Sequence, residues 1–184
     1  MVALNLGYFG IEFAVATHIG SVSLFADSID FIEDATVNAL ILLGLGWSAR
    51  SRAKLGMALS AVLLIPAIAT LWTAWLHWGS GQVPAPLPLT ATGAGALIVN
   101  LSCALMLARI RHAHGSLTRA AFLSARNDAI ANVAIMGAGV LTALKASAWP
   151  DLIVGLGILL MNLDAAREVF EAACAEHGVT QDDP

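Results

Sequence analysis

The stretch FADSIDFIEDATVNAL, residues 25–40, places four carboxylates inside a segment that is otherwise mostly apolar. At 100° per residue, a helix would bring four polar side chains within an arc of about 80°: Asp27, Asp30, Asp34 and Asn38. Asp30 and Asp34 are an i, i+4 pair, one turn apart on that face. Two carboxylates so close repel each other unless a proton, an arginine or a metal ion lies between them. The stretch therefore predicts a helix with one acidic face, and a divalent ion with oxygen ligands is the simplest way to neutralise it.

The composition around this stretch is that of a membrane protein. Of the 184 residues, 58% are hydrophobic and 12% are charged, roughly half the ~25% of a soluble domain. The mean hydropathy is +0.78. These values exclude a disordered chain and disfavour a soluble globular domain. At ~20 residues per span, the chain has room for about six transmembrane helices.

Six apolar segments can be separated along the chain by polar or turn-rich breaks. They lie at about residues 2–17, 21–47, 54–78, 89–108, 119–143 and 150–164. The stretch 79–88 is predicted to be a loop, since it contains two glycines and three prolines. Residues 145–150 are predicted to form a short turn, and Pro150 suits the first turn of the last helix. Because Glu12 interrupts the first segment and no basic region precedes it, we expect a retained span and not a cleaved signal.

The basic residues indicate the orientation in the membrane. Two of the connections carry nearly all of them: Arg50, Arg52, Lys54, Arg109, Arg111 and Arg119. The other three connections share only Lys145. By the positive-inside rule both termini are cytoplasmic. The predicted fold class is all-α: a polytopic membrane protein with a six-helix transmembrane domain at residues 1–170 and a short acidic cytoplasmic tail at 171–184.

A second polar face is predicted in FLSARNDAIANVAIMGAGV, residues 122–140. On a helix, Asp128 shares a face with Ser124 and Asn132, while Arg126 points away. An ion pair of Arg126 with Asp128 or with Glu12 is the alternative. A charge within a span costs about 2.5–3.5 kcal/mol, so each one calls for an explanation. If the acidic residues 27–34 only capped a helix, the remaining span would be too short to cross ~30 Å of hydrocarbon. Together the two faces favour a metal site.

These residues resemble those of the cation diffusion facilitators, a family of bacterial and organellar antiporters that exchange divalent metal ions for protons. The resemblance covers nearly the whole chain. It rests on the Asn5-Leu6-Gly7 start with Glu12, on GSVSLFAD leading into Asp30-x-x-x-Asp34, on Asn100, on Asn127-Asp128 and on Trp149-Pro150-Asp151. Most members also carry a cytoplasmic domain after the last helix. We expect this chain to be a short form without it.

The resemblance implies a tetrahedral metal site between the second and fifth helices. Asp30, Asp34 and Asp128 match three of its four positions. The fourth falls on Ser124, and a neutral hydroxyl is a poor zinc ligand. Asn127 is the preferred fourth ligand through its amide oxygen, with Ser124 or water as alternatives. Three carboxylates and one amide make a hard site, so Co²⁺, Cd²⁺, Fe²⁺ and Mn²⁺ stay open beside Zn²⁺.

The resemblance further implies efflux of divalent metal ions by proton antiport across a bacterial inner membrane. The expected partners are metal ions, protons, the lipid bilayer and a second copy of the chain, with no prosthetic group and no nucleic acid. The alternative is a membrane metal sensor or an accessory subunit that does not transport.

Two further classes of chemistry are disfavoured by the sequence. No span carries an HExxH motif or a Ser/His pairing, so an enzyme is not expected. Cys103 and Cys174 lack zinc-site spacing and cannot form a disulfide framework, and we interpret both as reduced and structurally incidental.

Overall fold

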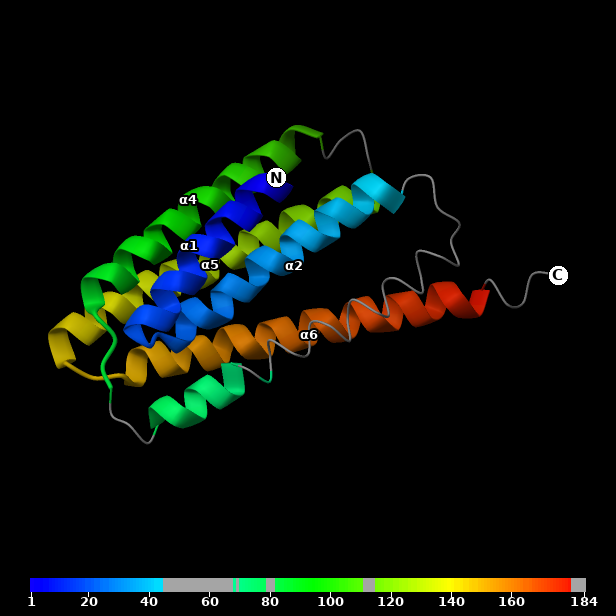
Figure 1. Cartoon of the computed structure of the whole chain (residues 1–184). Coiled ribbons are helices and arrows are strands. Elements are labelled where there is room, and N and C mark those ends of the chain that lie inside the picture. The colour runs from blue at the N-terminus through cyan, green and yellow to red at the C-terminus, as the bar shows by residue number, and fades with distance from the viewer. Residues whose placement is uncertain (45–67, 69, 79–81, 111–114, 180–184) are drawn as a thin grey trace.

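The computed structural model describes residues 1–44, 68, 70–78, 82–110 and 115–179, and this part of the chain is helical without strands. The long helices are α1 (Val2–Ile19), α2 (Val22–Gly44), α4 (Pro86–Ile110), α5 (Gly115–Lys145) and α6 (Trp149–Val179). A shorter helical segment covers residues 70–78 and lies beside the beginning of α6 (Figure 1). The predicted all-α class is confirmed.

The helices pack side by side as a bundle with α2 at its centre (Figure 1). α2 contacts α1, α6, α5 and α4, and the pair α4–α5 has the most extensive contact. A tight turn joins α1 to α2. Gly20 closes α1 with φ of 68°, and its N–H donates to the carbonyl of Ala16. This positive φ favours glycine, and a Cβ there would also lie 2.6 Å from Nε2 of His77, so that side chain would have to move.

The outside of the bundle is apolar, as in a protein surrounded by lipid. Leu87, Leu144 and Trp75 are more than three-quarters exposed, whereas many of the most buried hydrophobic residues are alanines. Among the residues that the structure describes, three helical stretches are long and apolar enough to cross a membrane: Val2–Ile19, Pro86–Met106 and Asn127–Lys145. The chain is a membrane protein. The six-span topology and the cytoplasmic termini stay predictions, since most of the third expected span (54–78) lies outside the described residues.

Several boundaries differ from the predicted ones. α4 begins at Pro86, inside the expected loop 79–88, because a proline is tolerated in the first turn of a helix, where its missing N–H is not needed. α4 runs to Ile110 and α5 starts at Gly115, so the expected connection at 109–119 is mostly helical. α6 continues to Val179, which makes much of the expected tail at 171–184 an extension of this helix.

Other expected features are confirmed by the structure or fall on residues that it does not describe. α5 ends at Lys145 and α6 begins at Trp149, which confirms the short turn and places Pro150 in the first turn of α6. Four of the basic residues that indicated the orientation lie outside the described residues: Arg50, Arg52, Lys54 and Arg111.

Candidate metal site on α2 and α5

The acidic face of α2 points into the bundle. Asp27 is fully buried, and Asp30, Glu33 and Asp34 are half-buried. Phe31 and Leu24, which fall outside the acidic arc, are buried as well. α2 is therefore enclosed by protein around this region, and its carboxylates face neighbouring helices instead of lipid.

α5 brings Asp128 to the same region. Its carboxylate is half-buried and interacts electrostatically with Asp34, and that of Asp30 interacts with Asp128 and with Asp34. Residues almost a hundred positions apart in the sequence thus meet in the interior. Carboxylates gathered in an apolar bundle repel one another, and a cation that binds among them relieves this repulsion.

The three carboxylates are neighbours without forming a closed coordination shell. Within the described parts of the chain, no three His, Cys, Asp or Glu side chains are placed to hold one metal ion. At this point Nδ2 of Asn5 on α1 donates to Oδ2 of Asp34 at 3.4 Å. Asp30, Asp34 and Asp128 as a ligand set therefore stay a prediction.

Asn5 links three helices at this point. It is fully buried on α1, and its Oδ1 accepts a hydrogen bond from Sγ of Cys103 on α4 at 3.4 Å. Cys103 is a free thiol, as expected, but its interpretation as incidental is wrong, because it fixes the amide that contacts Asp34. The sequence placed Asn5 in the family motif and did not indicate its contact with Asp34. The side chain of Cys174 lies outside the described residues.

A second carboxyl pair lies deeper in the bundle. Glu12 of α1 and Asp27 of α2 are both fully buried. The part of the chain that the structure describes offers no hydrogen-bond donor to either carboxylate. The two groups are placed to hydrogen-bond each other once one of them carries a proton. Glu12 therefore faces an acid of α2, whereas the sequence suggested Arg126 as its alternative partner.

The amides of α5 differ sharply in environment. Asn127, the preferred fourth ligand, is exposed and makes an interaction with another residue. Asn132, one turn after Asp128, is fully buried, and its Nδ2 donates to the carbonyl of Asp128 at 2.8 Å. Its Oδ1 has no hydrogen-bond partner in the described structure. The side chains of Ser124 and Arg126 lie outside the described residues.

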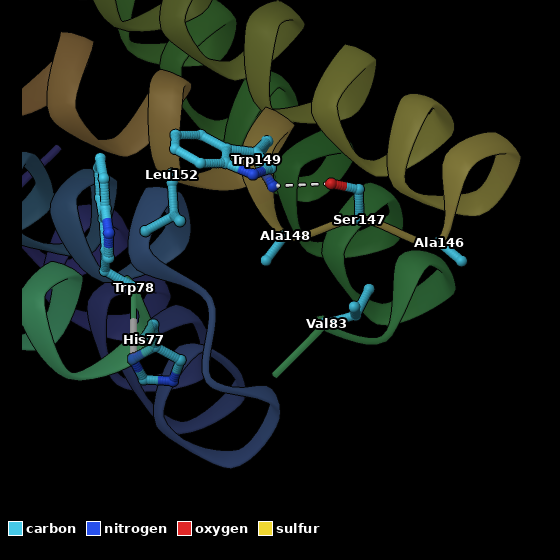
Figure 2. A pocket seen from close by; sticks show the side chains of 8 residues that line it. All are labelled: His77, Trp78, Val83, Ala146, Ser147, Ala148, Trp149 and Leu152. Atoms are coloured by element: carbon cyan, nitrogen blue, oxygen red, sulfur yellow. Dashed lines mark hydrogen bonds between the residues drawn. The ribbon is translucent and has the colours of Figure 1, made fainter. Parts of the chain in front are cut away.

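A separate pocket of about 220 Å³ lies at the end of the bundle where α6 begins (Figure 2). The pocket is lined by aromatic, aliphatic and small side chains, and none of them is a carboxylate: His77, Trp78, Val83, Ala146, Ser147, Ala148, Trp149 and Leu152. The rings of Trp78 and Trp149 pack edge to face, with their centroids 4.9 Å apart. The lining of this pocket includes no carboxylate that could bind a hard metal ion, so the acidic residues of α2 and α5 remain the candidate site.

Comparison with known proteins identifies the family. The family model of the cation efflux transmembrane domain matches residues 1–175, almost the whole chain. The search of curated proteins gave no match. A bundle with a lipid-facing exterior and acidic side chains inside fits that domain, and the chain belongs to the cation diffusion facilitator family.

Proposed function

We propose that the protein exports divalent metal ions by proton antiport, through a site formed by Asp30 and Asp34 of α2 and by Asp128 of α5. An amide oxygen of α5 completes the ligand set, with Asn127 and Asn132 as the two candidates. Three carboxylates and an amide favour hard or borderline ions, so the transported class includes Zn²⁺, Co²⁺, Fe²⁺ and Mn²⁺, and the softer Cd²⁺ is a further candidate.

One observation carries this proposal: the carboxylates of Asp30, Asp34 and Asp128 are electrostatic neighbours in the interior of a membrane protein. Charged groups at this depth are costly and mark ion pathways. The membership in a cation efflux family supports the same reading. Because the carboxylates do not yet form a closed shell, we infer that α2 and α5 side chains adjust around the ion as it binds.

The proposed cycle is alternating access. With the site open to the cytoplasm, the three carboxylates are deprotonated and capture the ion. When the site opens to a more acidic outer compartment, protons compete with the metal, and the ion leaves. The carboxylates return protonated, which avoids moving bare charge through the bilayer. Ligands that bind metal only when deprotonated release protons as it binds, so the two fluxes are linked.

Metal uptake into proteoliposomes under an imposed pH gradient tests the proposal. Zn²⁺, Cd²⁺, Co²⁺, Fe²⁺ and Mn²⁺ are compared for the wild type, Asp34→Ala and Asp128→Ala. Asp164→Ala is the matched control, because Asp164 is an exposed carboxylate on α6. We expect gradient-dependent flux in the wild type and in the control, and none in the two site variants.

Insertion of each variant is checked by its elution from a sizing column in detergent. Full flux in a well-inserted Asp34→Ala variant would contradict the assignment of the site. Metal binding by the wild type without any flux would contradict transport and support the sensor or accessory role.

A further inference from the structure

The carboxylate of Asp151 joins the beginning of α6 to the beginning of α2. Its Oδ2 accepts the backbone N–H of Val22 at 2.8 Å. Its Oδ1 accepts the hydroxyl of Ser21 at 2.7 Å, and the N–H and hydroxyl of Ser23 at 3.3 and 2.5 Å. Ser21 in turn caps the helix, since its Oγ accepts the N–H of Leu24 at 3.2 Å. A side chain of one helix therefore caps the N-terminus of another.

Two helix N-termini meet at this one carboxylate. Asp151 lies in the first turn of α6, and it accepts from the first N–H groups of α2. Both ends carry the positive pole of a helix dipole and unpaired N–H groups, so a negative charge between them is stabilised from both sides. Asp151 is 1% exposed, and Ser21, Val22 and Ser23 are no more exposed than that, so water does not compete for these bonds.

The backbones also approach closely at this junction. A Cβ on Gly155, one turn beyond Asp151 on α6, would lie 2.8 Å from the backbone of Val22 and Ser23. Leu152 packs against Val22 in the same apolar cluster. The beginning of α2 is thus held by hydrogen bonds, by an apolar contact and by close backbone packing.

We propose that Asp151 is a positioning residue for transport: it fixes the start of α2 to α6 and makes this junction the pivot about which the acidic part of α2 moves. The inference rests on the proposed function. Asp27, still fully buried, lies further along the same helix, and Asp30 and Asp34 follow it, where the side chains of α2 become half-buried. A helix held at one end can swing its other end as a rigid arm. If the junction is lost, α6 no longer constrains how the acidic part of α2 moves.

Asp151→Asn tests the proposal. The substitution keeps the shape of the side chain but replaces one acceptor oxygen by an NH₂ group, so at least one N–H or hydroxyl of α2 loses its acceptor. The loss of buried, charge-assisted hydrogen bonds at a moving junction is expected to lower kcat about tenfold or more. KM for the metal is expected to change less than about twofold, because the proposed ligands are untouched. Amide hydrogen exchange at Val22, at Ser23 or at both is expected to become faster, since at least one of the two N–H groups loses its acceptor.

Asp164→Asn is the matched control, the same substitution at an exposed site of α6, and it should leave kcat and exchange unchanged. Ser23→Ala, a milder variant, removes one hydroxyl of the junction and should give a smaller fall in kcat with KM unchanged. If Asp151→Asn does not insert, Ser23→Ala decides alone, and unchanged turnover in it overturns the proposal.

Wild-type kcat in Asp151→Asn also overturns it, as does a rise in KM with unchanged exchange, which would place Asp151 at the ion. Should the wild type show no flux, the proposed function fails. The junction is then judged by hydrogen exchange alone: faster exchange in Asp151→Asn supports it, and unchanged exchange contradicts it.

Discussion

Nδ2 of Asn5 lies 3.4 Å from Oδ2 of Asp34, which places a fully buried amide of α1 against a proposed metal ligand of α2. The thiol of Cys103 donates to the other end of the same amide, also at 3.4 Å. Because Oδ1 is engaged as an acceptor, Nδ2 is the end that faces Asp34. Groups that orient a ligand in this way commonly contribute to the metal affinity of the site.

Asn5→Ala should therefore weaken metal binding without removing a ligand. We expect KM for the transported ion to rise by about 10- to 100-fold, the usual range for the loss of an outer-shell partner. Initial rates of uptake over a range of metal concentrations give this value. Cys103→Ser, which keeps a donor toward Oδ1, is the control and should stay near wild type, whereas Cys103→Ala should move in the direction of Asn5→Ala. A fall in kcat with KM unchanged in Asn5→Ala would argue against the orienting role.

The two amides of α5 give a second prediction. The unpaired, fully buried Oδ1 of Asn132 costs free energy unless something binds to it, whereas the exposed Asn127 has no such cost. Asn132→Leu should therefore raise the melting temperature in detergent and lower the affinity for metal, and Asn127→Leu should change both less. Melting curves and equilibrium metal binding measure the two effects. If Asn127→Leu alone lowers the affinity, the fourth ligand is Asn127, as the sequence suggested.

The expected topology makes a prediction that does not depend on the site. Successive connections should lie on opposite sides of the membrane, with the two connections that are rich in Lys and Arg in the cytoplasm. A reporter enzyme that is active only outside the cytoplasm, fused after Pro84, should therefore be active. The same reporter fused after Pro184 should be inactive, and a cytoplasmic reporter should give the reverse pattern at both points. Activity of the outside reporter at Pro184 would reject the cytoplasmic C-terminus.

The sequence predicted the helices and the acidic face of α2 because both follow from periodicity and from the cost of charge in lipid. It also placed Asp128 with Ser124 and Asn132 on one face, since that depends only on the geometry of a single helix. Contacts between helices are different, because they depend on how each helix is rotated and how far it is shifted. The contact of Asn5 with Asp34 and the pairing of Glu12 with Asp27 are of this kind, and neither has a local signal.

The junction at Asp151 shows the same difference between features of a single helix, which the sequence predicts, and contacts between helices, which it does not. The sequence put Pro150 and Asp151 in the first turn of the last helix, and Ser21 and Ser23 before the acidic face. Nothing in either segment indicated that one carboxylate serves both helix ends, 130 residues apart for Ser21 and Asp151. The glycines of α5 and α6 also differ in a way that depends on the neighbouring helices. Gly139 and Gly155 meet neighbouring helices, but Gly137 and Gly157 have nothing within 4 Å of an added Cβ.

This contrast yields the last prediction, from the same substitution at two positions of one helix. Gly155→Ala would place its methyl 2.8 Å from the backbone of Val22 and Ser23, which cannot yield as a flexible side chain would. Overpacking of this kind costs about 1–3 kcal/mol. Gly157→Ala meets open space, and an alanine in a helix interior is more stable than a glycine by about 1 kcal/mol. In detergent, Gly155→Ala should melt below the wild type and Gly157→Ala at or above it. Because both variants change helix propensity equally, the difference between their melting temperatures measures the contact of α6 with α2, and equal melting temperatures would show that this close approach does not exist.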